Sequence, residues 1–220
     1  MEDSPIDTPT TSSISPNGQG QKDLRNTWMA KPAIVCDLDG TLRYNKNDPD
    51  GFINSAEDIA LYDHVIQALW GYRRDGYIIA IVTNQGGFAH GHIDQPEWDR
   101  QKGRMVEIAE ERHEDGWPVH MTLPAKCMAN GSKALYAYAS LRRKPSSGML
   151  AVLEHQAELN NVRIKWGQSY FIGDRGEDAE AVRHANRNLE GAAIQYVEAK
   201  EWRHRLRQKY GVDAGGDADE

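Results

Sequence analysis

The fold is decided by residues 33–41, AIVCDLDGT, where a short apolar run leads directly into two acids. A continuous apolar run of this length predicts a strand that is buried on both faces of a sheet. Asp37 and Asp39 are two residues apart, so on extended backbone their side chains point the same way. An Asp-Gly pair is also common in turns. Paired acids at the end of a buried strand are costly unless a cation or a substrate offsets them, which makes this pair a candidate site.

Outward from this stretch, apolar strands alternate with helical patterns. We expect strands at residues 33–36, 77–82, 119–122, 169–172 and 192–197. We expect helices at residues 56–74, 96–114, 148–160, 177–188 and 198–209. This alternation predicts an α/β fold, a doubly wound, Rossmann-like parallel sheet covered by helices on both faces. In such sheets ligands bind beyond the carboxyl ends of the strands.

The two ends of the chain differ in composition from its body. Residues 1–28 are rich in Ser, Thr, Pro, Gly and Asn, and residues 211–220 are acidic, so we expect both tails to be disordered around one domain at 29–210. Residues 1–27 carry four acids and two bases, and the C-terminal ten residues carry four acids and no base. The chain's net charge of −7 therefore leaves −1 on residues 28–210, which is no general nucleic-acid footprint. We expect activity to be independent of the first 28 residues.

Composition also limits the setting of the protein. No apolar run approaches the length that spans a bilayer, and the acidic start Met1–Pro5 lacks the pattern of a secretory signal. Cys36 and Cys127 are the only cysteines, and their spacing suggests neither a disulfide framework nor a zinc site. A reducing, cytoplasmic setting is the simplest interpretation.

Two further polar groups follow apolar segments. Thr83 and Asn84 begin the sequence TNQGG, in which a hydroxyl, an amide and glycine backbone N–H groups are able to cradle a phosphate. An ordinary polar turn explains the same residues equally well. Lys144 precedes a proline in the basic sequence RRKP and would offset phosphate charge, although basic runs are usually solvated surface.

The last group is the sequence IGDRGED at residues 172–178, which again puts acids after an apolar strand. Asp174 and Asp178 are four residues apart, across a turn that leads into a helix. Hard carboxylate oxygens at this place suit Mg²⁺. For Asp178 the alternative is a helix N-terminal acid that complements the helix dipole.

Taken in this order, the four groups resemble the motifs of the haloacid dehalogenase-like (HAD) phosphatase superfamily over about residues 32–197. The resemblance implies that Asp37 attacks phosphorus and forms an aspartyl phosphate. It implies that Asp39 protonates the leaving oxygen and later deprotonates water. Dehalogenases of this fold lack the second acid, so its presence favours phosphoryl chemistry.

The resemblance also assigns the ligands of phosphate and metal. Thr83 and Lys144 match the phosphate-binding hydroxyl and the charge-balancing lysine. Asp174 matches the main magnesium carboxylate, together with Asp37 and the backbone carbonyl of Asp39. Asp178 matches a position that often holds the metal through water. Mg²⁺ is the expected cofactor, because an anionic nucleophile must approach an anionic phosphate.

The spaces between the motifs are too short for a full cap domain. Two capless branches are similar: the polynucleotide 3′-phosphatases, through residues 143–149 (RKPSSGM), and the histidinol-phosphate and heptose-bisphosphate phosphatases, through residues 169–175 (SYFIGDR). The second branch usually has a zinc loop before its Lys-Pro motif. Here only Cys127 and the more distant His120 are available, so no zinc is expected.

These comparisons leave the substrate open. We favour a nucleic-acid 3′ end, with a small phosphomonoester of the heptose-bisphosphate or histidinol-phosphate type as the alternative. His90 takes a place where both branches often carry arginine, and we interpret His90 and His92 as a surface loop. A non-catalytic binding module on the same fold is a third hypothesis.

Overall fold

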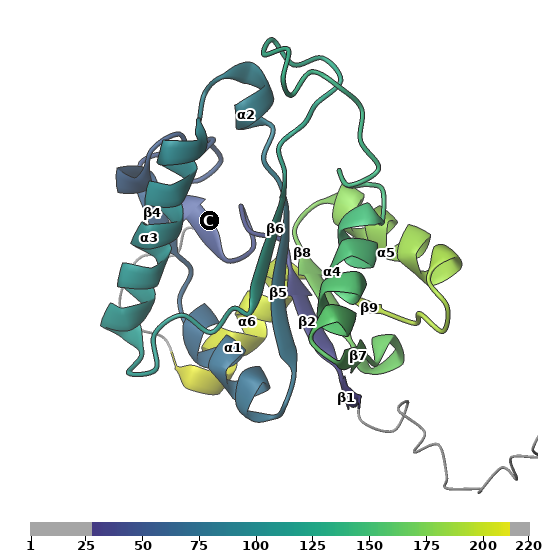
Figure 1. Ribbon diagram of the computed structural model, residues 1–220. Coiled ribbons are helices and arrows are strands. Elements are labelled where there is room, and N and C mark those ends of the chain that lie inside the picture. The colour runs from purple at the N-terminus through teal and green to yellow at the C-terminus, as the bar shows by residue number, and fades with distance from the viewer. Residues whose placement is uncertain (1–27, 212–220) are drawn as a thin grey trace, which may run out of the picture.

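The computed structural model describes residues 28–211 and is built around one parallel sheet of five strands (Figure 1). The strand order is β6-β5-β2-β8-β9, and each neighbouring pair is parallel. Their bounds are β2 (Ala33–Cys36), β5 (Ile78–Asn84), β6 (Met121–Ala125), β8 (Tyr170–Gly173) and β9 (Gln195–Glu198). The expected α/β class and the parallel sheet are confirmed. Strands β6 and β9 begin two and three residues later than the apolar pattern predicts.

Helices cover both faces of the sheet, because successive side chains of a strand point to opposite faces. On one face, Ile34 and Cys36 of β2 pack in a core with α1 (Val65–Arg74), α3 (Gln95–Arg112) and α6 (Ala199–Tyr210). On the other face, Ala33 and Val35 pack with α4 (Gly148–Leu159) and α5 (Gly176–Asn188). Figure 1 shows these two helical layers on either side of the strands. The predicted helices at 96–114, 148–160, 177–188 and 198–209 are therefore confirmed within two residues at each end.

The expected single helix at residues 56–74 is wrong. This segment forms a short 3₁₀ turn, η2 (Ala56–Asp58), then strand β4 (Ile59–Leu61), and only then α1. Strand β4 pairs antiparallel with β3 (Arg43–Asn45), so its apolar residues are buried at strand spacing. His64, at φ 61° in the left-handed region, separates this hairpin from α1. The hydrophobic spacing alone did not distinguish a strand plus a shorter helix from one long helix.

Three small elements complete the structure. Strands β1 (Met29–Lys31) and β7 (Val162–Ile164) form a separate parallel pair, which the sequence pattern did not predict. A one-turn helix, α2 (Gly87–His90), follows β5, and the 3₁₀ turn η3 (Trp166–Gln168) precedes β8. The segments between the motifs hold the hairpin, helices, 3₁₀ turns, the strands β6 and β7 and one long loop, so there is no full cap domain within residues 28–211. The expected tails lie outside the described residues, apart from their inner ends at 28 and 211.

None of the helices within residues 28–211 is both long and apolar enough to cross a membrane.

Candidate active site

The carboxyl ends of the three central strands bring the predicted residues together. Cys36 of β2 is in register with Ile81 of β5 and with Ile172 of β8. Asp37 follows β2 directly, and its backbone N–H donates to the Ile172 carbonyl at 2.9 Å. Asp174 follows β8, and Thr83 is the penultimate residue of β5. Residues separated by more than 130 positions thus meet at one edge of the sheet.

Lys144 enters this edge from the long loop after β6 and binds two acids. Its ammonium group is paired with Asp37 and lies 2.6 Å from Asp178 Oδ1, and it also donates to the Val82 carbonyl at 3.1 Å. All three side chains are buried. Burial raises the pKa of Asp37 to about 7, against the lowering effect of Lys144, with Asp178 and Asp39 adding to the rise. Burial alone would lower the pKa of Lys144, but Asp37 and Asp178 reverse this and raise it. The lysine is therefore a fixed cation beside Asp37.

Three carboxylates at this edge form a candidate metal centre. Asp37, Asp174 and Asp178 each offer an oxygen, and these oxygens lie within 4.8 Å of one another. Burial, with Asp178 as the next cause, raises the pKa of Asp174. Carboxylate oxygens gathered this closely repel one another and suit a hard cation such as Mg²⁺. The residues present therefore fit the expected ion.

Gly40 makes room for this centre. Its φ is +82°, and a Cβ atom added there would lie 2.1 Å from Asp174 Oδ2. The Thr41 hydroxyl donates to Asp174 Oδ1 at 3.3 Å, so the turn after β2 also orients the Asp174 carboxylate. Glycine is needed at residue 40 both for its left-handed backbone and for this close approach.

Asp178 has two contacts that compete with a metal role. Its Oδ2 accepts the Arg175 backbone N–H at 3.1 Å, at the start of α5, while its Oδ1 is paired with Lys144. Asp178 thus belongs to the cluster of acids and is also the predicted acid in the first turn of a helix, where it caps the backbone of α5. Its expected role as a water-mediated metal ligand stays a prediction.

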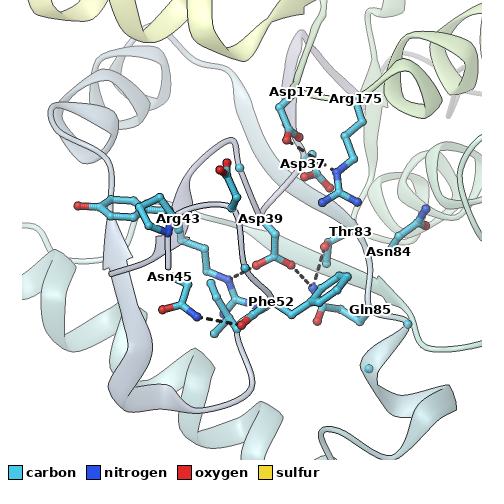
Figure 2. A pocket seen from close by; sticks show the side chains of 18 of the residues that line it. Asp37, Asp39, Arg43, Asn45, Phe52, Thr83, Asn84, Gln85, Asp174 and Arg175 are labelled. Carbon is cyan, nitrogen blue, oxygen red and sulfur yellow. Dashed lines mark hydrogen bonds and ion pairs between the residues drawn. The ribbon is translucent and has the colours of Figure 1, made fainter. Parts of the chain in front are cut away.

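Asp39 is held by two side chains that the sequence interpretation did not single out. Arg43 Nε donates to Asp39 Oδ1 at 2.7 Å, and Gln85 Nε2 donates to Asp39 Oδ2 at 2.6 Å. Gln85 Nε2 also lies 2.9 Å from Thr83 Oγ1. Figure 2 shows the Asp39 carboxylate directed toward Arg43 and Gln85, while Asp37 lies beside Asp174. As an acceptor from Gln85, the Thr83 hydroxyl keeps its own hydrogen to donate to another group, and its expected contact with phosphate stays a prediction.

Asn84 lies differently from what its candidate role suggests. Its amide exchanges two hydrogen bonds with the backbone of Lys144, at 3.0 Å each, and its Nδ2 also donates to Glu177 Oε1 at 3.0 Å. Asn84 therefore fixes the backbone that carries the lysine. Its expected contact with phosphate stays a prediction.

A cavity of about 840 Å³ opens in front of these groups. Its wall includes Asp37, Asp39 and Thr83, the loop at residues 49–54, and the basic side chains Arg143 and Arg175. His90 and His92 also line it, so the histidine pair belongs to the wall of the site and is not a plain surface loop. Aromatic side chains, including Tyr44 and Phe52, line the same cavity. A cavity lined by aromatic side chains and a few polar groups is typical of a ligand pocket.

Known proteins with similar sequences are named as phosphatases. The sequence profile of the family described as "Polynucleotide kinase 3 phosphatase" matches residues 32–201. Similar proteins include two D-glycero-beta-D-manno-heptose-1,7-bisphosphate 7-phosphatases. The one from Photorhabdus laumondii is 30% identical over 150 residues, which are 68% of this chain and 73% of that protein. The one from Yersinia pestis is 31% identical over 155 residues, which are 70% and 76%.

Solved structures extend the comparison to the fold. A protein from Mesorhizobium loti, named as a candidate HAD-like phosphatase, has a TM-score of 0.63 at 24% identity, covering 85% of this chain and 90% of its own. The D,D-heptose 1,7-bisphosphate phosphatase of B. bronchiseptica, complexed with magnesium and phosphate, has a TM-score of 0.57 at 18% identity, covering 81% and 99%. Both likenesses establish a HAD-like fold.

Proposed function

Because the chain belongs to the polynucleotide kinase 3 phosphatase family and is a HAD-like phosphatase, we propose that it hydrolyses phosphomonoesters through an aspartyl phosphate on Asp37. The observation that carries this proposal is the meeting of Asp37, Lys144, Asp174 and Asp178 in one buried cluster. A nucleophilic carboxylate, a fixed cation and a set of metal ligands are the parts that such a reaction needs. Lys144 offsets the charge of Asp37 and Asp178, and the third acid, Asp174, adds a negative charge that a bound cation would offset.

In the first step an oxygen of Asp37 forms a bond to phosphorus and the ester oxygen leaves. Lys144 offsets the negative charge that gathers as two anions approach, and the Thr83 hydroxyl donates to a phosphoryl oxygen. Asp39 gives a proton to the leaving oxygen. In the second step Asp39 takes a proton from water, the water oxygen bonds to phosphorus, and the Asp37–phosphorus bond breaks to release inorganic phosphate.

We propose Mg²⁺ as the cofactor, held by Asp37, Asp174 and the backbone carbonyl of Asp39, with Asp178 acting through water. When bound, the ion would neutralise charge on the phosphate oxygens and so lower the barrier to attack by a carboxylate. The three gathered carboxylates and the glycine that makes room for Asp174 support this assignment.

For the substrate we propose a small sugar phosphate of the heptose-bisphosphate type. The two relatives from Photorhabdus laumondii and Yersinia pestis act, by their names, on such a compound. The cavity of about 840 Å³ falls in the size range of small-molecule pockets. This substrate class was the alternative in the sequence analysis, and the comparisons favour it over a nucleic-acid 3′ end.

A second candidate is a 3′-phosphorylated polynucleotide end. The observation that favours it is the family match over residues 32–201, since that family is named for such an activity.

Two experiments test these proposals. Asp37→Asn should abolish Mg²⁺-dependent release of phosphate from p-nitrophenyl phosphate, and undiminished turnover would contradict the covalent mechanism. A panel should then compare heptose bisphosphate, histidinol phosphate and a 3′-phosphorylated oligonucleotide by kcat/KM. A value for the oligonucleotide at least tenfold above the sugar phosphates would transfer the proposal to the second candidate.

A further inference from the structure

Among the charged side chains that line the cavity, Arg43 is the most buried, at 0% exposed. It belongs to β3 and lies four residues after Asp39, on a turn that is closed by backbone bonds. Arg43 N donates to the Leu38 carbonyl at 3.1 Å, and Gly40 N donates back to the Arg43 carbonyl at 2.8 Å. This turn returns the chain so that the Arg43 guanidinium meets the Asp39 carboxylate.

Among residues 28–211, the Arg43 guanidinium forms an ion pair with one side chain. Asp39 is the carboxylate within ion-pairing distance, at 2.7 Å. The other neighbours are the Met105 sulfur, 3.9 Å from Nη1, and the Trp98 ring, whose centroid lies 5.6 Å from the guanidinium carbon. A buried cation is costly unless it is paired, so the environment directs the guanidinium to Asp39.

The second oxygen of Asp39 is fixed from the opposite side. Gln85 Nε2 reaches it at 2.6 Å, so the carboxylate accepts a bond at each oxygen (Figure 2). The Arg43 side chain is about 1% exposed and the Asp39 side chain 34%. A half-exposed carboxylate would otherwise sample several rotamers. The buried guanidinium of Arg43 at one oxygen and the buried amide of Gln85 at the other hold the Asp39 side chain in one rotamer.

We propose that Arg43, assisted by Gln85, is a positioning residue that holds Asp39 in place for both proton transfers. This inference rests on the proposed role of Asp39 as acid and base. Arg43 itself touches neither the phosphate nor the nucleophile. Its contribution is orientation, since proton transfer in the two steps requires the carboxyl oxygen within hydrogen-bond reach of the leaving oxygen and then of water.

The dependence on the leaving group separates this role from a structural one. The oxygen leaving an alkyl phosphate needs a proton, whereas p-nitrophenolate leaves readily without one. Arg43→Met should therefore lower kcat/KM for glycerol 2-phosphate by about tenfold to hundredfold, and leave kcat/KM for p-nitrophenyl phosphate within about threefold of wild type. Arg43→Lys keeps the charge but not the planar pair of donors, and should recover part of the loss.

A packing control and a double variant separate positioning of Asp39 from a general structural effect. Met105→Leu changes the packing against the guanidinium without touching Asp39, so it should alter neither substrate's kcat/KM. In an Asp39→Asn background, Arg43→Met should have no further effect on glycerol 2-phosphate, because a residue that acts through Asp39 has nothing left to position. If Arg43→Met does not fold, Arg43→Lys supplies the same comparison, and its smaller loss should again be confined to glycerol 2-phosphate.

Equal losses for both substrates, or a full loss in the Asp39→Asn background, would overturn the positioning role. Failure of the underlying mechanism would look different. Asp39→Asn alone would then leave kcat/KM for glycerol 2-phosphate near the wild-type value, whatever the behaviour of the Arg43 variants.

Discussion

Lys144 Nζ lies 2.6 Å from Asp178 Oδ1 and is also paired with Asp37, so one buried cation serves two buried carboxylates. Residues from a loop, from the end of β2 and from the first turn of α5 depend on this contact. Removing the cation would leave two acids in a poorly solvated place, whereas a metal ion bound nearby would offset part of their charge.

Lys144→Met should lower the free energy of unfolding by about 3–5 kcal/mol in Mg²⁺-free buffer, the usual cost of breaking a buried ion pair from one side. Saturating Mg²⁺ should recover part of the loss. Urea denaturation with and without Mg²⁺ measures both. Lys102→Met is the matched control, since Lys102 is paired with Asp99 at 2.7 Å on the surface and should lose no more than about 1 kcal/mol. Equal losses in the two variants would contradict the role of Lys144.

The raised pKa of Asp37 predicts how stability varies with pH. Burial raises this pKa to about 7 in the folded protein, compared with about 3.9 in an unfolded chain. The folded state then holds a proton that the unfolded state releases, so the Mg²⁺-free protein should lose stability as pH rises from about 4 to about 7 and change little above that. Scanning fluorimetry across this range gives the melting temperature at each pH.

Mg²⁺ should change this pH dependence, because it binds the ionised carboxylate. The rise in melting temperature on adding Mg²⁺ should therefore be larger at pH 8 than at pH 5.5. Asp37→Asn removes the titrating group and should reduce the difference between the two pH values. An identical Mg²⁺-induced rise at both pH values in the wild type would argue against Asp37 as a ligand.

Gly40 and Gly76 offer a matched pair for testing the metal site. Both have left-handed backbone, at φ +82° and +88°, but a Cβ atom at Gly40 would meet Asp174 Oδ2 at 2.1 Å, while one at Gly76 would meet nothing within 4 Å. Each alanine variant should lose about 1–2 kcal/mol of stability through backbone strain. Only Gly40→Ala should also lose Mg²⁺-dependent stabilisation and turnover, as measured by melting temperature and phosphate release. Normal Mg²⁺ binding in Gly40→Ala would rule out the proposed position of Asp174.

Much of the sheet and the site was predictable from local patterns. The strand that ends at Cys36 is a continuous apolar run, and Asp37, Thr83 and Asp174 follow or end such runs, so one topological rule places them at the same edge. The hairpin of β3 and β4 was not predictable in this way. Ile59 and Leu61 fit both a helical and a strand pattern, and only pairing with Arg43–Asn45 decides between them.

The roles of Arg43 and Gln85 were missed for a related reason. Arg43 lies four residues after Asp39, a spacing that signals contact on a helix, whereas here a closed turn makes the contact. Its burial depends on Trp98 and Met105 of α3, more than fifty residues away. The residues next to Arg43 in the sequence do not indicate that side chains of α3 pack against it. The residues that flank Arg43, apart from Leu42, are mostly polar, so the sequence around it gave no signal of its burial.

Phe52 should contribute to substrate affinity rather than to the chemical steps. It is 81% exposed at the wall of the cavity, and its backbone carbonyl accepts from Asn45 Nδ2 at 2.9 Å, so the ring is exposed on an anchored loop. Partial burial of such a ring by a substrate is worth roughly 1.5 kcal/mol. Phe52→Ala should therefore raise KM by about tenfold and leave kcat within about twofold.

Steady-state kinetics on p-nitrophenyl phosphate and on the preferred sugar phosphate test this expectation. Acetyl phosphate, whose leaving group is small, should show little change in KM. Leu141→Ala is the matched control, because Leu141 is equally exposed, at 81%, but does not line the cavity. Phe52→Leu should give an intermediate KM, since it keeps part of the apolar area. A fall in kcat with unchanged KM would mean that the loop at residues 49–54 acts on the reacting groups, because ground-state binding would then be intact and only the transition state affected.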